Sequence, residues 1–185
     1  LGVDLIGTSS RASHVHFCTG QPSYYIRMMG LLRGRSLALD PAQEVHKVWN
    51  ADLVGEALPM ADSLFCNELE AETLCRYLGL EDVPDADVGL VVNTMGDKGS
   101  RARYRGEDLT IPVVPGGKPV DVTGAGDTYR AGFYAALYRG HDVPEALVIA
   151  SAVSSFTVEK VGALTNIPSW DRVMERAEPV IARIC

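Results

Sequence analysis

The sequence predicts an α/β fold with a mainly parallel sheet. Short apolar runs alternate with segments of helical periodicity along most of the 185 residues. Successive runs lie about a dozen residues or more apart, the length that a crossover between parallel strands requires. The run at 88–93 is almost wholly apolar, as expected for a parallel strand covered on both faces. Together these patterns indicate repeated strand–helix–strand units.

The first half of the chain is expected to alternate strands and helices. Pro22 suits the first turn of a helix, because its missing amide hydrogen is not needed there. Asn67 and Gly79 are typical of residues that begin and end a helix. In chain order, we expect a strand at 15–18, a helix at 22–34, a strand at 36–39, a helical stretch at 44–58, a strand at 63–66 and a helix at 67–79.

The second half begins with the strand at 88–93, and its pattern then changes. Segments 100–104 and 109–114 flank Arg105-Gly106-Glu107-Asp108, which indicates a β-hairpin. Three helices are expected to complete the chain, at 125–139, 144–158 and 170–184.

Composition and charge exclude several classes of protein. Apolar residues make up 46% and charged residues 22%, which excludes general disorder. The formal net charge of −7 argues against a nucleic-acid partner, which would need a basic surface. No apolar stretch is long enough to span a bilayer, so no membrane partner is expected. The four cysteines lack C-x-x-C spacing, which favours buried thiols in a reducing compartment and a cytoplasmic protein.

The strongest chemical signal is the segment D-V-T-G-A-G-D at 121–127, which leads directly into a predicted helix. Glycines at a helix start leave backbone N–H groups unpaired, and the helix dipole adds positive charge there. The segment therefore predicts an anion site. Asp127 would repel a bound phosphate, but it fits as a base for a hydroxyl that attacks phosphorus. The alternative is a tight glycine turn in which the dipole stabilises Asp127.

Two other glycine motifs are excluded by their residues. A dinucleotide-binding G-x-G-x-x-G motif would need glycine where Tyr129 stands, which argues against an oxidoreductase. A P-loop would need glycine in place of Pro112 and serine or threonine in place of Pro119.

The segment at 121–133, D-V-T-G-A-G-D-T-Y-R-A-G-F, resembles the second signature of the PfkB (ribokinase-like) carbohydrate and nucleoside kinases. Other segments resemble family motifs in order and spacing: D-P at 40–41, N-E-L-E at 67–70, T-M-G-D-K-G at 94–99 and V-E-K-V-G-A at 158–163. The resemblance covers essentially the whole chain. It implies a three-layer α/β/α ribokinase-like fold, in agreement with the predicted parallel sheet.

The resemblance also implies a role for each motif residue. Asp127 would be the catalytic base for a primary hydroxyl, and the amides of Gly124, Ala125 and Gly126 would form the anion hole. Arg130 lies one turn after Asp127 and would reach the substrate or the transferred phosphate. The residues implied to bind ATP are Asn67, Thr94, Gly96 and Gly99.

Two cation sites follow from the same resemblance. Glu70 would hold Mg²⁺ through water. Asp121 and Thr123, with backbone around 157–162, would hold a monovalent cation such as K⁺.

Each of these roles has a structural alternative. Asn67 and Glu70 also form the pattern of a capping box, which a helix uses without any metal. The glycine segment at 94–99 also fits a simple strand-to-hairpin turn, and Arg130 also fits a surface ion pair. His14 and His16 share one face of a strand, but no carboxylate stands at matching spacing, so the sequence does not favour a metal there.

The resemblance favours a nucleoside as the acceptor. The form G-D-T-Y-R-A-G-F and the segment at 15–22 are closer to archaeal nucleoside kinases and adenosine-kinase-like members. The expected reaction is transfer of the γ-phosphoryl group of ATP to the 5′-hydroxyl. A sugar kinase for a ribose- or fructose-type substrate and a catalytically inactive ATP-binding fragment both stay open.

The start of the chain suggests a missing front part. The sequence begins at Leu1, without methionine, in a phrase that resembles the middle of a protein. The family's N-terminal strands, early glycine motif and small β lid have no counterpart in it. We therefore expect residues 1–185 to be the nucleotide-binding and catalytic part of one ribokinase-like domain. An unpaired sheet edge would then favour a homodimer.

Overall fold

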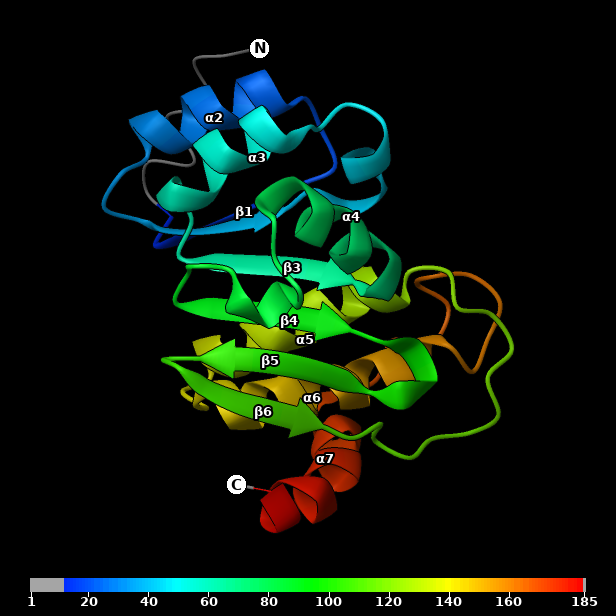
Figure 1. Ribbon diagram of the computed structural model, residues 1–185. Helices are drawn as coiled ribbons and strands as arrows, with labels where there is room; N and C mark the ends of the chain where they lie inside the picture. The colour runs from blue at the N-terminus through cyan, green and yellow to red at the C-terminus, as the bar shows by residue number, and fades with distance from the viewer. Residues whose placement is uncertain (1–11, 185) are drawn as a thin grey trace. The chain divides into compact units, whose positions relative to one another are not determined.

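The computed structural model describes residues 12–184 (Figure 1). The opening phrase around Leu1 lies outside the described residues. Within them, the chain forms two compact units. Unit 1 consists of residues 12–94 and 101–108, and unit 2 consists of residues 95–100 and 109–184.

The strands form one sheet in the order β1-β2-β3-β4-β5-β6 (Figure 1). The pairs β1–β2, β2–β3 and β3–β4 are parallel. The prediction of an α/β fold with a mainly parallel sheet is therefore confirmed. The strands are β1 (His14–Cys18), β2 (Ser36–Asp40), β3 (Ser63–Asn67), β4 (Leu90–Thr94), β5 (Ser100–Tyr104) and β6 (Glu107–Ile111).

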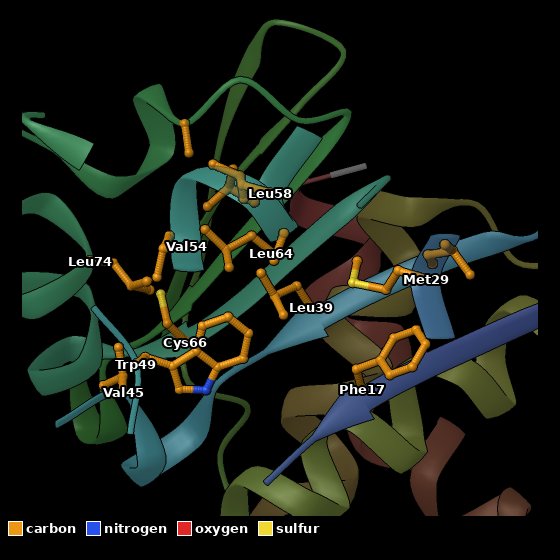
Figure 2. Close-up of a cluster of buried hydrophobic side chains, with 14 of the residues drawn as sticks. Phe17, Met29, Leu39, Val45, Trp49, Val54, Leu58, Leu64, Cys66 and Leu74 are labelled. Carbon is orange, nitrogen blue, oxygen red and sulfur yellow. The ribbon is translucent and has the colours of Figure 1, made fainter. Parts of the chain in front are cut away.

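Helices α2 (Pro22–Leu31), α3 (Ala51–Ala57) and α4 (Glu68–Leu78) connect the parallel strands of unit 1. Their apolar side chains meet those of one sheet face in a continuous cluster (Figure 2). Leu39 and Leu64, which pair across β2 and β3, lie in this cluster and are fully buried. Burying one such leucine contributes about 1.5–3 kcal/mol. The core thus fixes which residues of each strand point toward the helices.

The prediction of one continuous helical stretch at 44–58 is wrong, because this region contains three short helices. The structure has a short 3₁₀ helix at Ala42–His46, then α3 at Ala51–Ala57 and a second 3₁₀ turn at Leu58–Met60. The break has a local cause, because Asn50 is in an extended conformation and its side chain accepts a hydrogen bond from the Leu53 amide. An N-cap of this kind begins a new helix.

The hairpin after β4 is tighter than predicted. The predicted turn spans 105–108, whereas β5 ends at Tyr104 and β6 begins at Glu107. Arg105 and Gly106 both have positive φ, at 53° and 85°. Two successive residues with positive φ form the turn whose twist matches a two-residue hairpin. The second strand consequently begins earlier in the sequence and ends before Pro112.

Unit 2 contains helices α5 (Ala125–Tyr138), α6 (Val143–Thr157) and α7 (Trp170–Ile184), close to their predicted bounds. Gly132 of α5 lies against α6, and a Cβ there would come within 2.9 Å of the Val153 side chain. The small residue therefore lets the two helices approach closely. Within residues 12–184, every helix is too short or too polar to cross a membrane.

Candidate active site

The segment 121–124 reaches the start of α5 through a backbone that favours glycine. Gly124 is the N-cap residue and has a φ of 78°. A Cβ on Gly124 would lie 2.3 Å from the Cβ of Ala163. Both the left-handed backbone and the close neighbour therefore require glycine at this position.

Asp121 joins the segments 120–124 and 158–163. Its Oδ1 accepts a hydrogen bond from the Thr123 amide, and its Oδ2 accepts one from the Gly162 amide, each at 2.9 Å. The amide of Val120 donates to the Val158 carbonyl at 2.7 Å. The Gly162 and Thr123 amides hold the pKa of Asp121 below its usual value. Asp121 therefore stays ionised near neutral pH, as a ligand for a monovalent cation must.

The N-terminus of α5 presents backbone amides without side-chain caps. Gly124, the N-cap residue, has no side chain with which to cap the helix. Within the described part of the chain, the amides of Gly124, Gly126 and Asp127 have no hydrogen-bond partner, whereas the Ala125 amide donates to the Val122 carbonyl at 3.1 Å. Two of the three amides predicted for the anion hole are thus available, and the Asp127 amide joins them. Together with the helix dipole they can bind an anion.

Asp127 and Arg130 form an ion pair at the start of α5. Nη1 of Arg130 lies 2.9 Å from Oδ1 of Asp127, and the Asp127 side chain is 78% exposed. The Arg130 guanidinium also folds back toward Gly126, where an added Cβ would lie 3.4 Å from Nη1. The helix start therefore carries a carboxylate and a cation beside the open amides. This places Arg130 next to Asp127 as the sequence predicts.

The glycine segment of unit 2 is a short loop whose ends are tied together. Gly96–Lys98 is a 3₁₀ turn, and Gly96 and Gly99 both have positive φ. A Cβ on Gly99 would lie 2.2 Å from the Ile111 carbonyl oxygen. The Met95 amide donates to the Gly99 carbonyl at 2.8 Å. The loop conformation thus depends on both glycines.

A buried hydrogen bond that the sequence did not reveal connects this loop to α5. The hydroxyl groups of Ser100 and Tyr129 lie 2.8 Å apart, and both residues are buried. Burial raises the pKa of Tyr129 far above its usual value, so the phenol stays protonated. The structure therefore joins Ser100, the residue that follows the loop at 96–99, to the second turn of α5 within unit 2.

In unit 1, Asn67 and Glu70 form the capping box of α4. The Asn67 side chain accepts from the Glu70 amide at 2.9 Å, and the Asn67 amide donates to Oε2 of Glu70 at 2.8 Å. Asn67 and Thr94 pair across β3 and β4, at the carboxyl ends of both strands. The hydroxyl group of Thr94 donates to the Cys66 carbonyl at 3.4 Å. The structural alternative for Asn67 and Glu70 is therefore realised, and a ligand role would be additional.

A second network that the sequence did not indicate surrounds Glu159. Its Oε1 accepts from the Gly117 amide at 2.6 Å and pairs with Arg176 of α7 at 2.8 Å. Asn166 donates to Oε2 at 3.2 Å. Partial burial opposes ionisation, but the Gly117 amide and the Arg176 guanidinium hold the pKa of Glu159 below its usual value. The network anchors the segments that lead into and flank the loop at 120–124.

Exposed apolar side chains lie along these same segments. These side chains stand on segments 120–124 and 158–167, which run beside the N-terminus of α5. The residues are Val120, Val122, Val161, Leu164 and Ile167, each more than 60% exposed.

The sheet topology and the glycine loops define an α/β protein in which the start of α5 presents open backbone amides. The family model "pfkB family carbohydrate kinase" matches residues 39–170, and the chain belongs to this family. The predicted family is thereby confirmed. Its members are phosphotransferases that act on hydroxyl acceptors.

Relatives of known function support the same assignment. A nucleoside kinase of Methanocaldococcus jannaschii is 36% identical over 89% of this chain and 55% of that protein. A nucleoside kinase of Methanothermobacter thermautotrophicus is 37% identical over 91% of this chain and 54% of that protein. The chain thus spans about half the length of these relatives.

Solved structures confirm the ribokinase-like fold. The M. jannaschii nucleoside kinase structure aligns with a TM-score of 0.83 at 34% identity, over 91% of this chain and 56% of that one. The structure of Arabidopsis thaliana ribokinase with ribose and ATP aligns with a TM-score of 0.80 at 26% identity, over 96% of this chain and 60% of that one.

Proposed function

We propose that the chain carries the phosphoryl-transfer site of an ATP-dependent kinase, with the 5′-hydroxyl of a nucleoside as the acceptor. The observation that carries the proposal is the start of α5, where open amides, Asp127 and Arg130 lie together. The two archaeal relatives described as nucleoside kinases support the acceptor class. The ribokinase complex with ATP supports the donor.

The proposed chemistry uses the groups at this helix start. The amides of Gly124, Gly126 and Asp127, with Arg130, stabilise the negative charge of the phosphoryl group. Asp127 accepts the proton of the attacking hydroxyl, whose oxygen forms a bond to the γ-phosphorus. The bond between that phosphorus and the bridging oxygen breaks, and ADP leaves with the electron pair. Before the substrate binds, Arg130 pairs with the Asp127 carboxylate and holds it beside the amides. The substrate hydroxyl then replaces Arg130 as the hydrogen-bond partner of Asp127.

The remaining predicted residues are proposed to bind the nucleotide and its cations. In unit 2, Gly96 and Gly99 shape a loop for ATP. In unit 1, Asn67 and Thr94 present polar groups at the carboxyl ends of their strands, where ligands of parallel sheets bind. The Glu70 carboxylate offers the oxygen donors that Mg²⁺ prefers, here through water. A magnesium ion supplies charge neutralisation of the phosphates.

A monovalent cation fits the turn around Asp121. This carboxylate is ionised, and the segment 157–162 beside it offers backbone carbonyl groups. Asp121 and Thr123 are therefore proposed to hold K⁺. The kinase rate should be higher in the presence of K⁺ than in the presence of a large organic cation. Equal rates with the two cations would contradict a monovalent-cation site at Asp121 and Thr123.

Calorimetric titration with Mg-ATP, combined with a coupled kinase assay, tests the function. Nucleosides should be phosphorylated faster than ribose or fructose. Faster turnover of sugars would support the sugar-kinase alternative, and binding without turnover would support an ATP-binding fragment. Absence of Mg-ATP binding would contradict all three.

A homodimer is a further part of the proposal. Among the described strands, β1 lies at one edge of the sheet. An edge strand has backbone groups that can pair with a strand of another chain. Light scattering coupled to size-exclusion chromatography should give twice the mass of the chain. A monomer at high protein concentration would contradict it.

A further inference from the structure

Three side chains of types that can bind metal ions converge at the carboxyl ends of β1 and β2. They are His16, Cys18 and Asp40, and their ligand atoms all lie within 4.8 Å of one another. All three residues belong to unit 1. The sequence could not favour a metal at His16, because the carboxylate comes from a strand 24 residues away.

The parallel register explains why these side chains meet. His16 and Cys18 stand two residues apart on β1 and therefore point to the same face. Cys18 pairs with Asp40 across β1 and β2, so the Asp40 side chain points to that face as well. Phe17 and Leu39, the alternate residues, belong to the apolar cluster under the helices of unit 1 (Figure 2). The three ligand groups thus occupy the opposite face of the sheet.

Contacts within unit 1 orient the Asp40 carboxylate toward His16. Asp40 is fully buried, and its Oδ1 accepts a hydrogen bond from the Ala42 amide at 3.1 Å. Its Oδ2 lies 3.3 Å from Nε2 of His16. The His16 ring packs edge-on against Phe65, with ring centroids 5.3 Å apart. These contacts fix one oxygen and one nitrogen atom near each other.

The backbone around Cys18 is also held in place. Its carbonyl accepts a hydrogen bond from the hydroxyl group of Tyr25 at 2.8 Å. Its Sγ lies 3.5 Å from the hydroxyl oxygen of Thr19, a residue with a φ of 51°. The chain turns sharply after the strand, and the thiol stays at the strand end beside Asp40.

We propose that His16, Cys18 and Asp40 bind one divalent transition-metal ion, with Zn²⁺ the best match. One imidazole nitrogen, one thiolate sulfur and one carboxylate oxygen are the donor types that zinc accepts. This set differs from the oxygen donors proposed for Mg²⁺ at Glu70. Three protein ligands leave a fourth tetrahedral position for water or for an anionic group of a ligand.

Metal binding replaces one arrangement by another. Without metal, His16 and Asp40 are within hydrogen-bond distance, and all three residues have further interactions. With metal, Cys18 loses its proton to solvent and its sulfur bonds to the ion. A thiolate–metal bond is therefore the feature that separates a metal site from a polar cluster.

Titration of the metal-free chain with Co²⁺, a spectroscopic substitute for Zn²⁺, tests the proposal. One equivalent should bind and produce both the visible bands of tetrahedral cobalt and the charge-transfer band of a cobalt–thiolate bond. Zn²⁺ should displace the cobalt and raise the Tm of the chain, because it binds the folded state.

Matched variants identify the ligands. Cys18→Ser should abolish the charge-transfer band, whereas Cys75→Ser, which changes another half-buried thiol, should keep it. His16→Ala should weaken binding at least about tenfold, whereas His14→Ala, on the same face of β1, should not. Circular dichroism checks that each variant folds. No binding, no thiolate band, a band that survives Cys18→Ser, or equal affinities for His14→Ala and His16→Ala would each overturn the proposal.

Discussion

Helices α4 and α5 begin in opposite ways. The start of α4 is closed, because Asn67 and Glu70 satisfy each other's amides. The start of α5 is open, because its N-cap residue, Gly124, has no side chain with which to cap it. A glycine N-cap gives up the hydrogen bond of a capping side chain, which costs about a few tenths of a kcal/mol, and it leaves amides that can bind an anion. The α4 start is therefore expected to govern stability first, and the α5 start to govern function.

The largest expected effect concerns Asp127. Asp127→Asn keeps the size of the side chain but removes the base, so turnover should fall about 10²–10⁴-fold. Mg-ATP affinity should change little, because the open amides remain. The turnover number is measured by steady-state kinetics, with the substitution made in protein that has first been shown to phosphorylate its acceptor. Asp171→Asn, which alters an exposed acidic residue in the first turn of α7, serves as the control. Unchanged turnover in Asp127→Asn would remove this residue from the mechanism.

Gly124→Ala should have the next largest effect. Its positive φ disfavours any side chain, and the new Cβ would meet Ala163. Strain and overpacking together should cost about 2–5 kcal/mol of unfolding free energy and weaken Mg-ATP binding, measured by denaturation and calorimetry.

Gly140→Ala is the matched control for Gly124→Ala. Gly140 has a φ of 90°, and a Cβ added there would have no neighbour within 4 Å among the described residues. This variant should therefore lose only the stability that backbone strain removes and keep its Mg-ATP affinity. Equal effects of the two substitutions would show that the contact with Ala163 is unimportant.

Glu159→Gln tests the hydrogen-bond network around Glu159, which anchors the segments that flank the loop at 120–124. Replacing a carboxylate that accepts from Gly117 and Arg176 should cost about 1.5–3 kcal/mol at neutral pH. The pKa of Glu159 is lowered by folding, so its stabilisation is present above the unfolded pKa of about 4.3 and is lost as the pH falls through the lower folded pKa.

Urea denaturation at several pH values checks the Glu159 prediction. The difference between the wild type and Glu159→Gln should be largest near neutral pH and should close in acid. Glu175→Gln, at an exposed position of α7, should match the wild type throughout. A difference independent of pH would mean that the charge of Glu159 contributes nothing.

The sequence predicts those parts of the fold that depend on local chemistry. The capping box at Asn67, the glycine at 124 and the apolar strand before Thr94 all follow from neighbouring residues. The break before Asn50 was missed, because an asparagine in a helical pattern is read as a weak helix former until its cap contact is seen.

Contacts between segments that are distant in the sequence could not be predicted from the sequence alone. Ser100 meets Tyr129, and His16 meets Asp40, only because strand register and helix packing place them together. Asp127 and Arg130 were predicted to share a helix face because their separation is a single turn. Local motifs thus indicated the proposed phosphoryl site, whereas the supporting network at Glu159 needed the structure.

The smallest expected effect distinguishes the two roles of Asn67. Asn67→Ala and Asn50→Ala each remove an asparagine N-cap, of α4 and α3 respectively. Each should cost about 1 kcal/mol of unfolding free energy. Only Asn67→Ala should also weaken Mg-ATP binding, because Asn67 lies beside Thr94 at the carboxyl ends of β3 and β4. If calorimetry gives both variants the wild-type affinity, Asn67 is a cap alone, and the contrast between a closed α4 and an open α5 is complete.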